Sequence, residues 1–182
     1  MKTLIFSLGT MILLYISRAS LRSLRSHGFY RFFAWEIMLA LFLLNVEFWF
    51  RDPLAWYQVI AWFLLIISLA PLGYGVHFLR TRGQPTATRA DDDSLLAFEK
   101  TTALVTSGIY HYIRHPLYSS LFLLTWGIFF KHLSVTGFIL AAIATLFLIL
   151  TAKADEAECT RFFGSQYQEY MQKTKMFIPY LF

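Results

Sequence analysis

Two histidines, an arginine and three tyrosines fall within the segment GIYHYIRHPLYSS (108–120), directly before an apolar stretch. Arg114 carries a permanent guanidinium charge, and the imidazole of His115 titrates near neutral pH. Pro116 biases His115 away from helical backbone angles and is itself suited to the first position of a helix. The first turn of that helix offers free N–H groups and a positive dipole end, which suit an anionic or carboxylate-bearing ligand. From these residues alone, a ligand site and an interfacial lipid anchor are both open interpretations.

The elements that position this segment belong to a membrane protein. The 182 residues are 57% hydrophobic and 19% aromatic, with a mean hydropathy of +0.53, whereas soluble domains are roughly 45–50% apolar. The net charge is +5, and the basic residues lie between apolar runs. Membrane topology explains this placement better than nucleic-acid binding does. The single cysteine, Cys159, excludes an internal disulfide, a multi-cysteine metal site and a dithiol redox motif. The composition therefore predicts an all-α integral membrane protein.

About five transmembrane helices are expected, because a hydrocarbon core about 30 Å thick needs roughly 20 apolar residues in a helix. The apolar stretches are residues 3–17, 33–50, 54–79, 117–130 and 133–152. The first is either a cleaved signal peptide or a span, and the basic residues after it favour a span. The very short connections 51–53 and 131–132 predict antiparallel hairpins.

Basic residues set the expected orientation. Lys and Arg number 4, 5 and 4 in residues 18–34, 79–115 and 153–175, against three elsewhere. By the positive-inside rule, the N-terminus faces out and the C-terminus is cytoplasmic, in the cell inner membrane.

We expect a single membrane domain over 1–182, with three spans in 1–79 and the motif-bearing region in 80–182. In the cytoplasmic loop, Asp93 or Ser94 could cap a short interfacial helix, and the acid run Asp91–Asp93 is interpreted as solvated loop or helix start rather than a cation site.

The polar residues after the fifth apolar stretch predict a helical lid over the site. Gly164 should end one helix, and Ser165 with Gln168 forms a capping box for the next helix, which would be this lid.

Other titratable residues in or near the apolar stretches are expected to stabilise the structure rather than to carry chemistry. Glu36 is expected to snorkel or to pair with Arg31, and Glu47 to meet Arg51, rather than to relay protons. A haem or metal site from His77, His111 and His115 is less favoured than interfacial hydrogen bonding, because no further ligand has suitable spacing.

One combination of motifs is specific. LVTSGIYHYIRHPLYSS, followed by two apolar stretches and DEAECTRFFGSQYQEYMQKTKMFIP, resembles the isoprenylcysteine carboxyl methyltransferase family and its phospholipid methyltransferase relatives. The motifs cover residues 100 to 180 and follow the order and separations of that family. The resemblance implies that S-adenosylmethionine is held without a Rossmann domain, at the cytoplasmic end of the bundle, between the loop before the penultimate span and the C-terminal helix.

By position, the resemblance implies a set of cofactor-binding residues: Thr102, Ala103, Leu104, Val105, Tyr110, His115, Pro116, Leu117, Tyr118, Asp155 and Glu156. The first residue of the acidic pair is usually glutamate in the family, and Asp155 shortens its reach. The candidate catalytic residues are Arg114, His115 and Glu156, with His115 orienting the cofactor rather than taking a proton. No metal is expected.

One departure concerns the acceptor. Where the prenylcysteine enzymes have an arginine that handles the substrate carboxylate, this chain has Thr151, and Lys153 faces a different side of the helix. We therefore expect isoprenylcysteine carboxyl methyltransferase-like, S-adenosylmethionine-dependent methyl transfer to a lipophilic, membrane-embedded acceptor. The missing arginine slightly favours an acceptor other than a carboxylate, and methylation of O, N or S stays open. The alternatives are a phospholipid or other lipid N-methyltransferase, a non-catalytic membrane scaffold and, third, a haem or quinone carrier. No oligomeric state is specified by the sequence.

Overall fold

The computed structural model describes residues 1–84 and 99–181, and the regular elements in these ranges are helices. The acid run 91–93 and Ser94 lie outside them. The elements are α1 (Lys2–Ser17), η1 (Ser20–Arg22), α2 (His27–Asn45), η2 (Val46–Phe48), α3 (Trp56–Arg82), η3 (Gly108–His111), α4 (Pro116–Phe129), α5 (Val135–Phe163) and α6 (Ser165–Lys173). The prediction of an all-α protein is confirmed.

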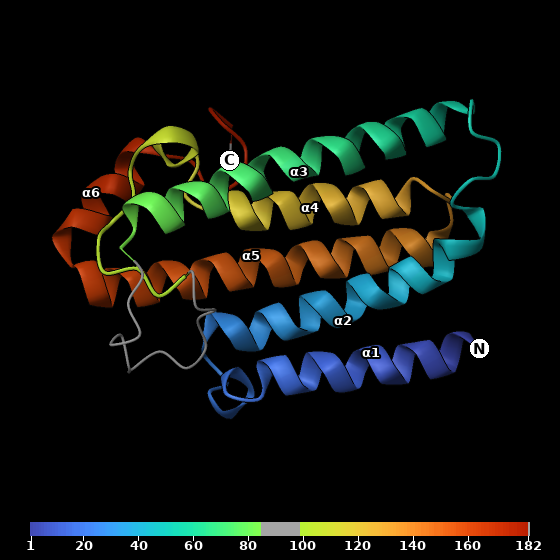
Figure 1. The fold of residues 1–182 in the computed structure, drawn as a ribbon, viewed down its shortest axis with the longest axis horizontal. Coiled ribbons are helices and arrows are strands. Elements are labelled where there is room, and N and C mark those ends of the chain that lie inside the picture. The colour runs from blue at the N-terminus through green and yellow to red at the C-terminus, as the bar shows by residue number, and fades with distance from the viewer. Residues whose placement is uncertain (85–98, 182) are drawn as a thin grey trace.

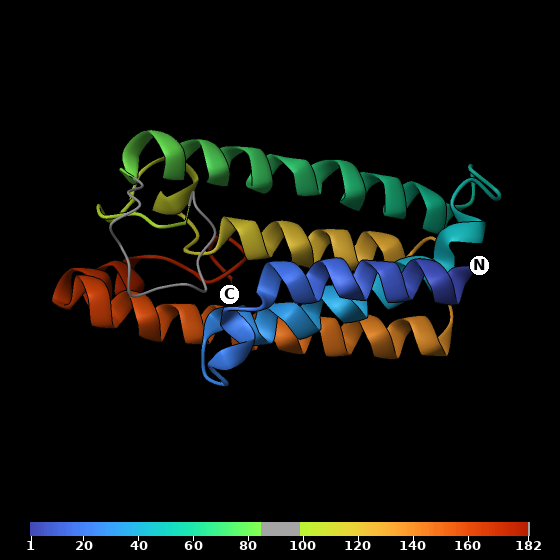
Figure 2. The same cartoon turned by 60° about the horizontal axis from the view of Figure 1, so that its bottom comes forward.

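Five apolar helices, α1 to α5, lie side by side along one long axis (Figures 1 and 2). Among the described residues, α2, α3 and α5 are long and apolar enough to cross a membrane, while α1 and α4 are shorter apolar helices. The N-terminus and the connections α2–α3 and α4–α5 lie at one end of the bundle (Figure 1). The other end, where α3 and α5 finish and α4 begins, is called the site end below.

The closest helix pairs are α3 with α4 and α2 with α5, and α1 packs on α2. Each predicted hairpin is antiparallel, but α2 and α3 diverge and pack on different partners (Figure 2). Small residues allow close approach of α2 and α5, since Ala34, Ala141 and Ala144 are fully buried. Phe63, Ile66 and Leu69 of α3 are more than 60% exposed, which suits a helix face in contact with lipid.

The carboxylates of α2 and η2 have other partners than the sequence predicts. Glu36 accepts a 2.9 Å hydrogen bond from Thr10 of α1, and Glu47 forms a 2.8 Å ion pair with Lys2. Arg31 instead donates to both carboxylate oxygens of Glu99. The predicted pairs were wrong because helical spacing identifies neighbours only on the same helix, and these partners come from other segments.

A buried lysine joins the two connections at the end opposite the site. Lys131 is 1% exposed and donates to Gln58 Oε1 at 2.9 Å and to the Trp49 carbonyl at 3.2 Å. Its Nζ lies 3.5 Å from the ring centroid of Trp62, a cation–π geometry. Burial lowers the pKa of Lys131 to about 8. This cluster fixes the opposite end of the bundle.

Helix α5 is longer than its apolar run. It continues from Val135 through the polar residues to Phe163, so the acidic pair lies on the same rigid helix as the span. Gly164, with φ of +63°, ends it as predicted. The capping box is wrong: α6 already begins at Ser165, Gly164 occupies the N-cap position and no side chain caps the helix.

Candidate active site

Helix α4 begins at Pro116, with His115 at its N-cap position, as the sequence predicts. The preceding turn is set by Gly108, whose φ is +64° and whose added Cβ would lie 2.2 Å from the Phe78 ring of α3. Only glycine suits this backbone and this close approach. The turn carries Tyr110 into the interior, where it is 6% exposed.

The C-terminal segment holds the residues before α4 in place. Arg114 N–H donates to the Lys175 carbonyl at 2.8 Å, and Lys175 N–H donates to the Tyr112 carbonyl at 3.1 Å. His115 N–H donates to the Met176 carbonyl at 3.2 Å. These bonds form a short parallel pairing that covers one side of the site end, so the chain after α6 contributes to the site together with α6 itself.

Four charged side chains form one network between this loop and α5. Arg114 Nε donates to Glu156 Oε1 at 2.8 Å, and Arg114 Nη1 donates to the carbonyls of Met171 and Thr174. The two ring nitrogens of His115 face different carboxylates: Nδ1 lies 3.4 Å from Asp155 Oδ2, and Nε2 lies 3.4 Å from Glu156 Oε1. His115 is 5% exposed. The consecutive carboxylates of α5 therefore bind consecutive basic residues of the loop.

The electrostatics of this network favour a protonated histidine. Burial opposes the charge on His115, but hydrogen bonds to Asp155 and Glu156 outweigh it and raise the pKa of His115 above 6.5. Burial also raises the pKa of Tyr110, and of Tyr167 and Tyr170 on α6. The phenols remain neutral at physiological pH, so they offer hydrogen bonds and ring faces rather than basic oxygens.

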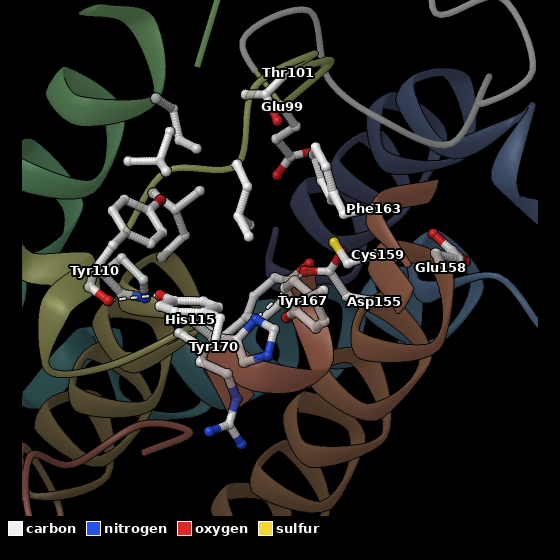
Figure 3. A pocket seen from close by; sticks show the side chains of 17 residues that line it. Glu99, Thr101, Tyr110, His115, Asp155, Glu158, Cys159, Phe163, Tyr167 and Tyr170 are labelled. Carbon is white, nitrogen blue, oxygen red and sulfur yellow. Dashed lines mark hydrogen bonds and ion pairs between the residues drawn. The ribbon is translucent and has the colours of Figure 1, made fainter. Parts of the chain in front are cut away.

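A pocket opens beside this network. The space in it that no atom occupies, including the part open to solvent, is about 740 Å³. Figure 3 shows Tyr110, Tyr167 and Tyr170 gathered around His115, with Glu99 and Thr101 farther across the pocket. Of the predicted residues, the pocket is lined by Leu104, Val105, Tyr110, Arg114, His115, Pro116, Leu117, Tyr118 and Asp155.

Three predicted residues do not line the pocket. Glu156 lies behind it, bound to Arg114 and His115. Thr102 and Ala103 turn toward the end of α3, where both of their N–H groups donate to the Gly83 carbonyl. Thr101, next to them in the chain, lines the pocket instead.

Sequence reasoning also missed Glu99, Glu158, Cys159 and Phe163, which line the pocket. Asp155, Glu158 and Cys159 recur at positions i, i+3 and i+4 on α5, so they lie on one face of the helix. This spacing would have identified the two additional residues once Asp155 was accepted as a site residue.

Comparison with known proteins gives two sequence matches. Residues 92–167 match the phospholipid methyltransferase family. A methanethiol S-methyltransferase of Crocosphaera subtropica (strain ATCC 51142 / BH68) is 28% identical over 76 residues, which are 42% of this chain and 29% of that relative. The chain thus spans less than a third of the relative's length, and no solved structure matches it. The matched segment is the motif-bearing part of the chain, and both findings support its resemblance to membrane methyltransferases.

Thr151, at the position where the prenylcysteine enzymes that the motifs resemble have an arginine, is not accessible from the pocket. Thr151 is fully buried, and its hydroxyl donates back along α5 to the Phe147 carbonyl at 2.7 Å. The two basic side chains that line the described pocket, Arg114 and His115, are both bound to carboxylates of α5. The wall of the site therefore presents no free cation among the described residues.

The grouping of His77, His111 and His115 considered from the sequence is not formed in the described part of the chain. The one cluster there with metal-ligand character comprises His27, Asp155 and Glu158, whose ligand atoms lie within 4.8 Å of one another. His27 and Glu158 in that cluster already hydrogen-bond directly to each other at 2.5 Å, which is closer than two ligands of one ion are expected to approach. We therefore interpret the cluster as an ion pair beside Asp155.

Proposed function

We propose that this protein transfers a methyl group from S-adenosylmethionine to a lipophilic, uncharged acceptor that reaches the pocket from the membrane. The observation that carries the proposal is the position of the Arg114–His115–Asp155–Glu156 network. Three of its residues, Arg114, His115 and Asp155, line an aromatic pocket at the end of helices long and apolar enough to span a bilayer. A water-soluble methyl donor and a membrane-soluble acceptor can meet at such a place.

The residues present fit this cofactor, which when bound supplies a methyl group on a positively charged sulfonium sulfur. Asp155 presents an anionic acceptor for amino or hydroxyl donors. The first turn of α4, after Pro116, directs backbone N–H groups and the positive end of its dipole toward a carboxylate. The ring faces of Tyr110, Tyr118 and Tyr167 attract a cation and exclude water.

The chain's own contribution is alignment rather than strong base catalysis. A sulfonium methyl is already activated, so holding donor and acceptor in line supplies much of the rate enhancement. His115, protonated and bound on both ring nitrogens, is a donor that fixes the two carboxylates of α5. Arg114 ties Glu156 to the end of α6 and thus keeps the lid over the pocket.

The nature of the acceptor is part of the proposal. The buried Thr151 and the paired basic residues favour a thiol or an amine over a carboxylate. A thiol acceptor is consistent with the methanethiol S-methyltransferase relative, and a lipid amine with the phospholipid methyltransferase family. A non-catalytic membrane scaffold is the alternative from another class, and it requires no cofactor binding.

The proposed location is the inner membrane, with the N-terminus outside and the site end in the cytoplasm. The support is the basic residues, which number 4, 5 and 4 in the segments 18–34, 79–115 and 153–175. The described parts of these segments lie at the site end of the bundle (Figure 1). A cytoplasmic site would have direct access to a soluble cofactor.

Calorimetric titration of the detergent-solubilised protein with S-adenosylmethionine tests the proposal. His115→Ala and Asp155→Ala should each weaken binding at least tenfold, a loss of about 1.4 kcal/mol. His132→Ala and Glu47→Ala are matched controls, because these residues lie at the opposite end of the bundle. There His132 stacks on Phe48, and Glu47 pairs with Lys2. A folded wild type that binds no S-adenosylmethionine would contradict the proposal and favour the scaffold.

A further inference from the structure

A buried ion pair joins the start of α2 to the end of α5 beside the pocket. His27, the first residue of α2, is fully buried, and Glu158 is 8% exposed. The backbone N–H of His27 donates to Glu158 Oε1 at 2.9 Å, and its ring Nδ1 lies 2.5 Å from Oε2. Both oxygens of one carboxylate are therefore held by one residue. The positive end of the α2 dipole adds to this attraction.

The position of Glu158 on α5 connects this pair to the site. Glu158 and Asp155 are three residues apart and both line the pocket, whereas Glu156 points to Arg114. Figure 3 shows Glu158 directed away from His115, on the far side of Asp155. Ligand-capable atoms of His27, Asp155 and Glu158 lie within 4.8 Å of one another. Asp155 thus has an imidazole on each side, His115 from the loop and His27 from α2.

A purely structural contact does not explain the histidine at position 27. Its Nε2 is buried and has no hydrogen-bond partner, and an unpaired buried polar atom is destabilising. Ser26 already caps α2 by accepting from the Phe29 N–H at 3.1 Å, so the helix start does not need a further cap. What His27 adds is a second imidazole close to Asp155, with ligand-capable atoms within 4.8 Å.

We propose that His27 is a positioning residue for the cofactor site. It anchors the last turns of α5 on α2 through Glu158, and its charge favours the ionised Asp155 directed toward amino or hydroxyl groups of the ligand. The inference rests on the proposed function, because it concerns affinity for S-adenosylmethionine. It extends the site to a helix outside the matched region 92–167.

The test compares His27→Phe, which removes the ring donor and the charge, with His27→Gln, which keeps a donor for Glu158. The matched control is Asn45→Leu at the other end of α2. Asn45 is also fully buried, donates to the Ile128 carbonyl at 2.8 Å and has an unpartnered buried oxygen. Dissociation constants for S-adenosylmethionine and thermal midpoints are measured for all three variants and the wild type.

We expect His27→Phe to weaken S-adenosylmethionine binding at least tenfold and His27→Gln to recover part of that loss. Asn45→Leu should lower the thermal midpoint without changing the dissociation constant. The inference alone is overturned if the wild type binds and His27→Phe binds within twofold of it, or if Asn45→Leu weakens binding equally. Absence of binding by the folded wild type would overturn the proposed function as well.

A second measurement tests the anchor without any cofactor. Cys159, the single cysteine of the chain, follows Glu158 directly on α5 and lines the pocket. His27→Phe should accelerate its alkylation by N-ethylmaleimide severalfold relative to the wild type and to Asn45→Leu. Equal rates in all three proteins would show that His27 does not hold the end of α5.

Discussion

His115 and Asp155 form a buried pair that joins the start of α4 to the end of α5, with 3.4 Å between Nδ1 and Oδ2. The two residues lie 40 positions apart in the sequence and come from separate helix ends. Their pairing brings the loop before α4, the polar end of α5 and the C-terminal segment to one pocket. The following predictions test this arrangement.

The raised pKa of His115 makes stability depend on pH. A group whose folded pKa lies above its unfolded value of 6.5 contributes fully below pH 6.5, and the contribution is lost as the pH rises through the folded pKa. The thermal midpoint of the wild type should therefore fall from pH 6.5 upward. Thermal unfolding of the wild type and His115→Gln between pH 6 and 8 checks this.

Lys131, with a pKa of about 8, also loses its proton toward the upper end of this range, but it does so in both proteins, so their difference reports on His115. His115→Gln should show a shallower dependence of the midpoint on pH than the wild type. Equal slopes in the two proteins would mean that His115 has the same pKa in the folded and unfolded states.

Gly108→Ala should destabilise the protein and weaken cofactor binding. The left-handed backbone conformation destabilises a residue that has a side chain by about 1–2 kcal/mol. The added Cβ would also lie 2.2 Å from the Phe78 ring. Gly73→Ala in α3 is the control, because a Cβ there meets nothing within 4 Å. It should be neutral or stabilising by up to about 1 kcal/mol. Denaturation curves in detergent measure the stability of both variants. Equal stability of Gly108→Ala and Gly73→Ala would show that the turn does not depend on glycine.

Arg114→Lys should loosen the lid while preserving the charge. The guanidinium binds Glu156 through Nε and the Met171 and Thr174 carbonyls through Nη1, and a lysine ammonium cannot reproduce this planar arrangement. We expect the free energy of unfolding to fall by about 1.5–3 kcal/mol and proteolysis after α6 to accelerate. Arg82→Lys, on an exposed residue of α3, should change neither quantity.

The acceptor prediction follows from Thr151. Because this buried residue bonds to its own helix, the protein should methylate lipophilic thiols or amines at least tenfold faster than a prenylated cysteine carboxylate. Transfer of a radiolabelled methyl group to three lipids that differ only in the acceptor atom measures this ratio. Preference for the carboxylate would show that another residue performs the role of the missing arginine.

Hydropathy and motif order were sufficient to predict the helices and much of the pocket. The apolar runs place the bounds of α1, α3 and α4 to within three residues, and Pro116 places the start of α4. The family motifs identify His115 and Asp155, which the structure brings together. These features are local or fixed by a motif, so one sequence suffices to find them.

The interactions that join distant helices were not predictable in the same way. The partners His27 and Glu158 are 131 residues apart, and Arg31 and Glu99 are 68 apart, so no spacing rule pairs them. Hydropathy also ended the fifth span near Ala152, although α5 continues to Phe163, because hydropathy reports the extent of the apolar run and a helix can continue beyond it.

The central claim is that S-adenosylmethionine occupies the pocket beside His115 and Asp155, and protection of Cys159 tests it most directly. The single cysteine lines this pocket, and its Sγ lies 3.6 Å from Asp155 Oδ1. We predict that saturating S-adenosylmethionine slows alkylation of Cys159 at least tenfold in the wild type and has little effect in Asp155→Ala. An alkylation rate unchanged by the cofactor in the folded wild type would contradict the assignment of this pocket.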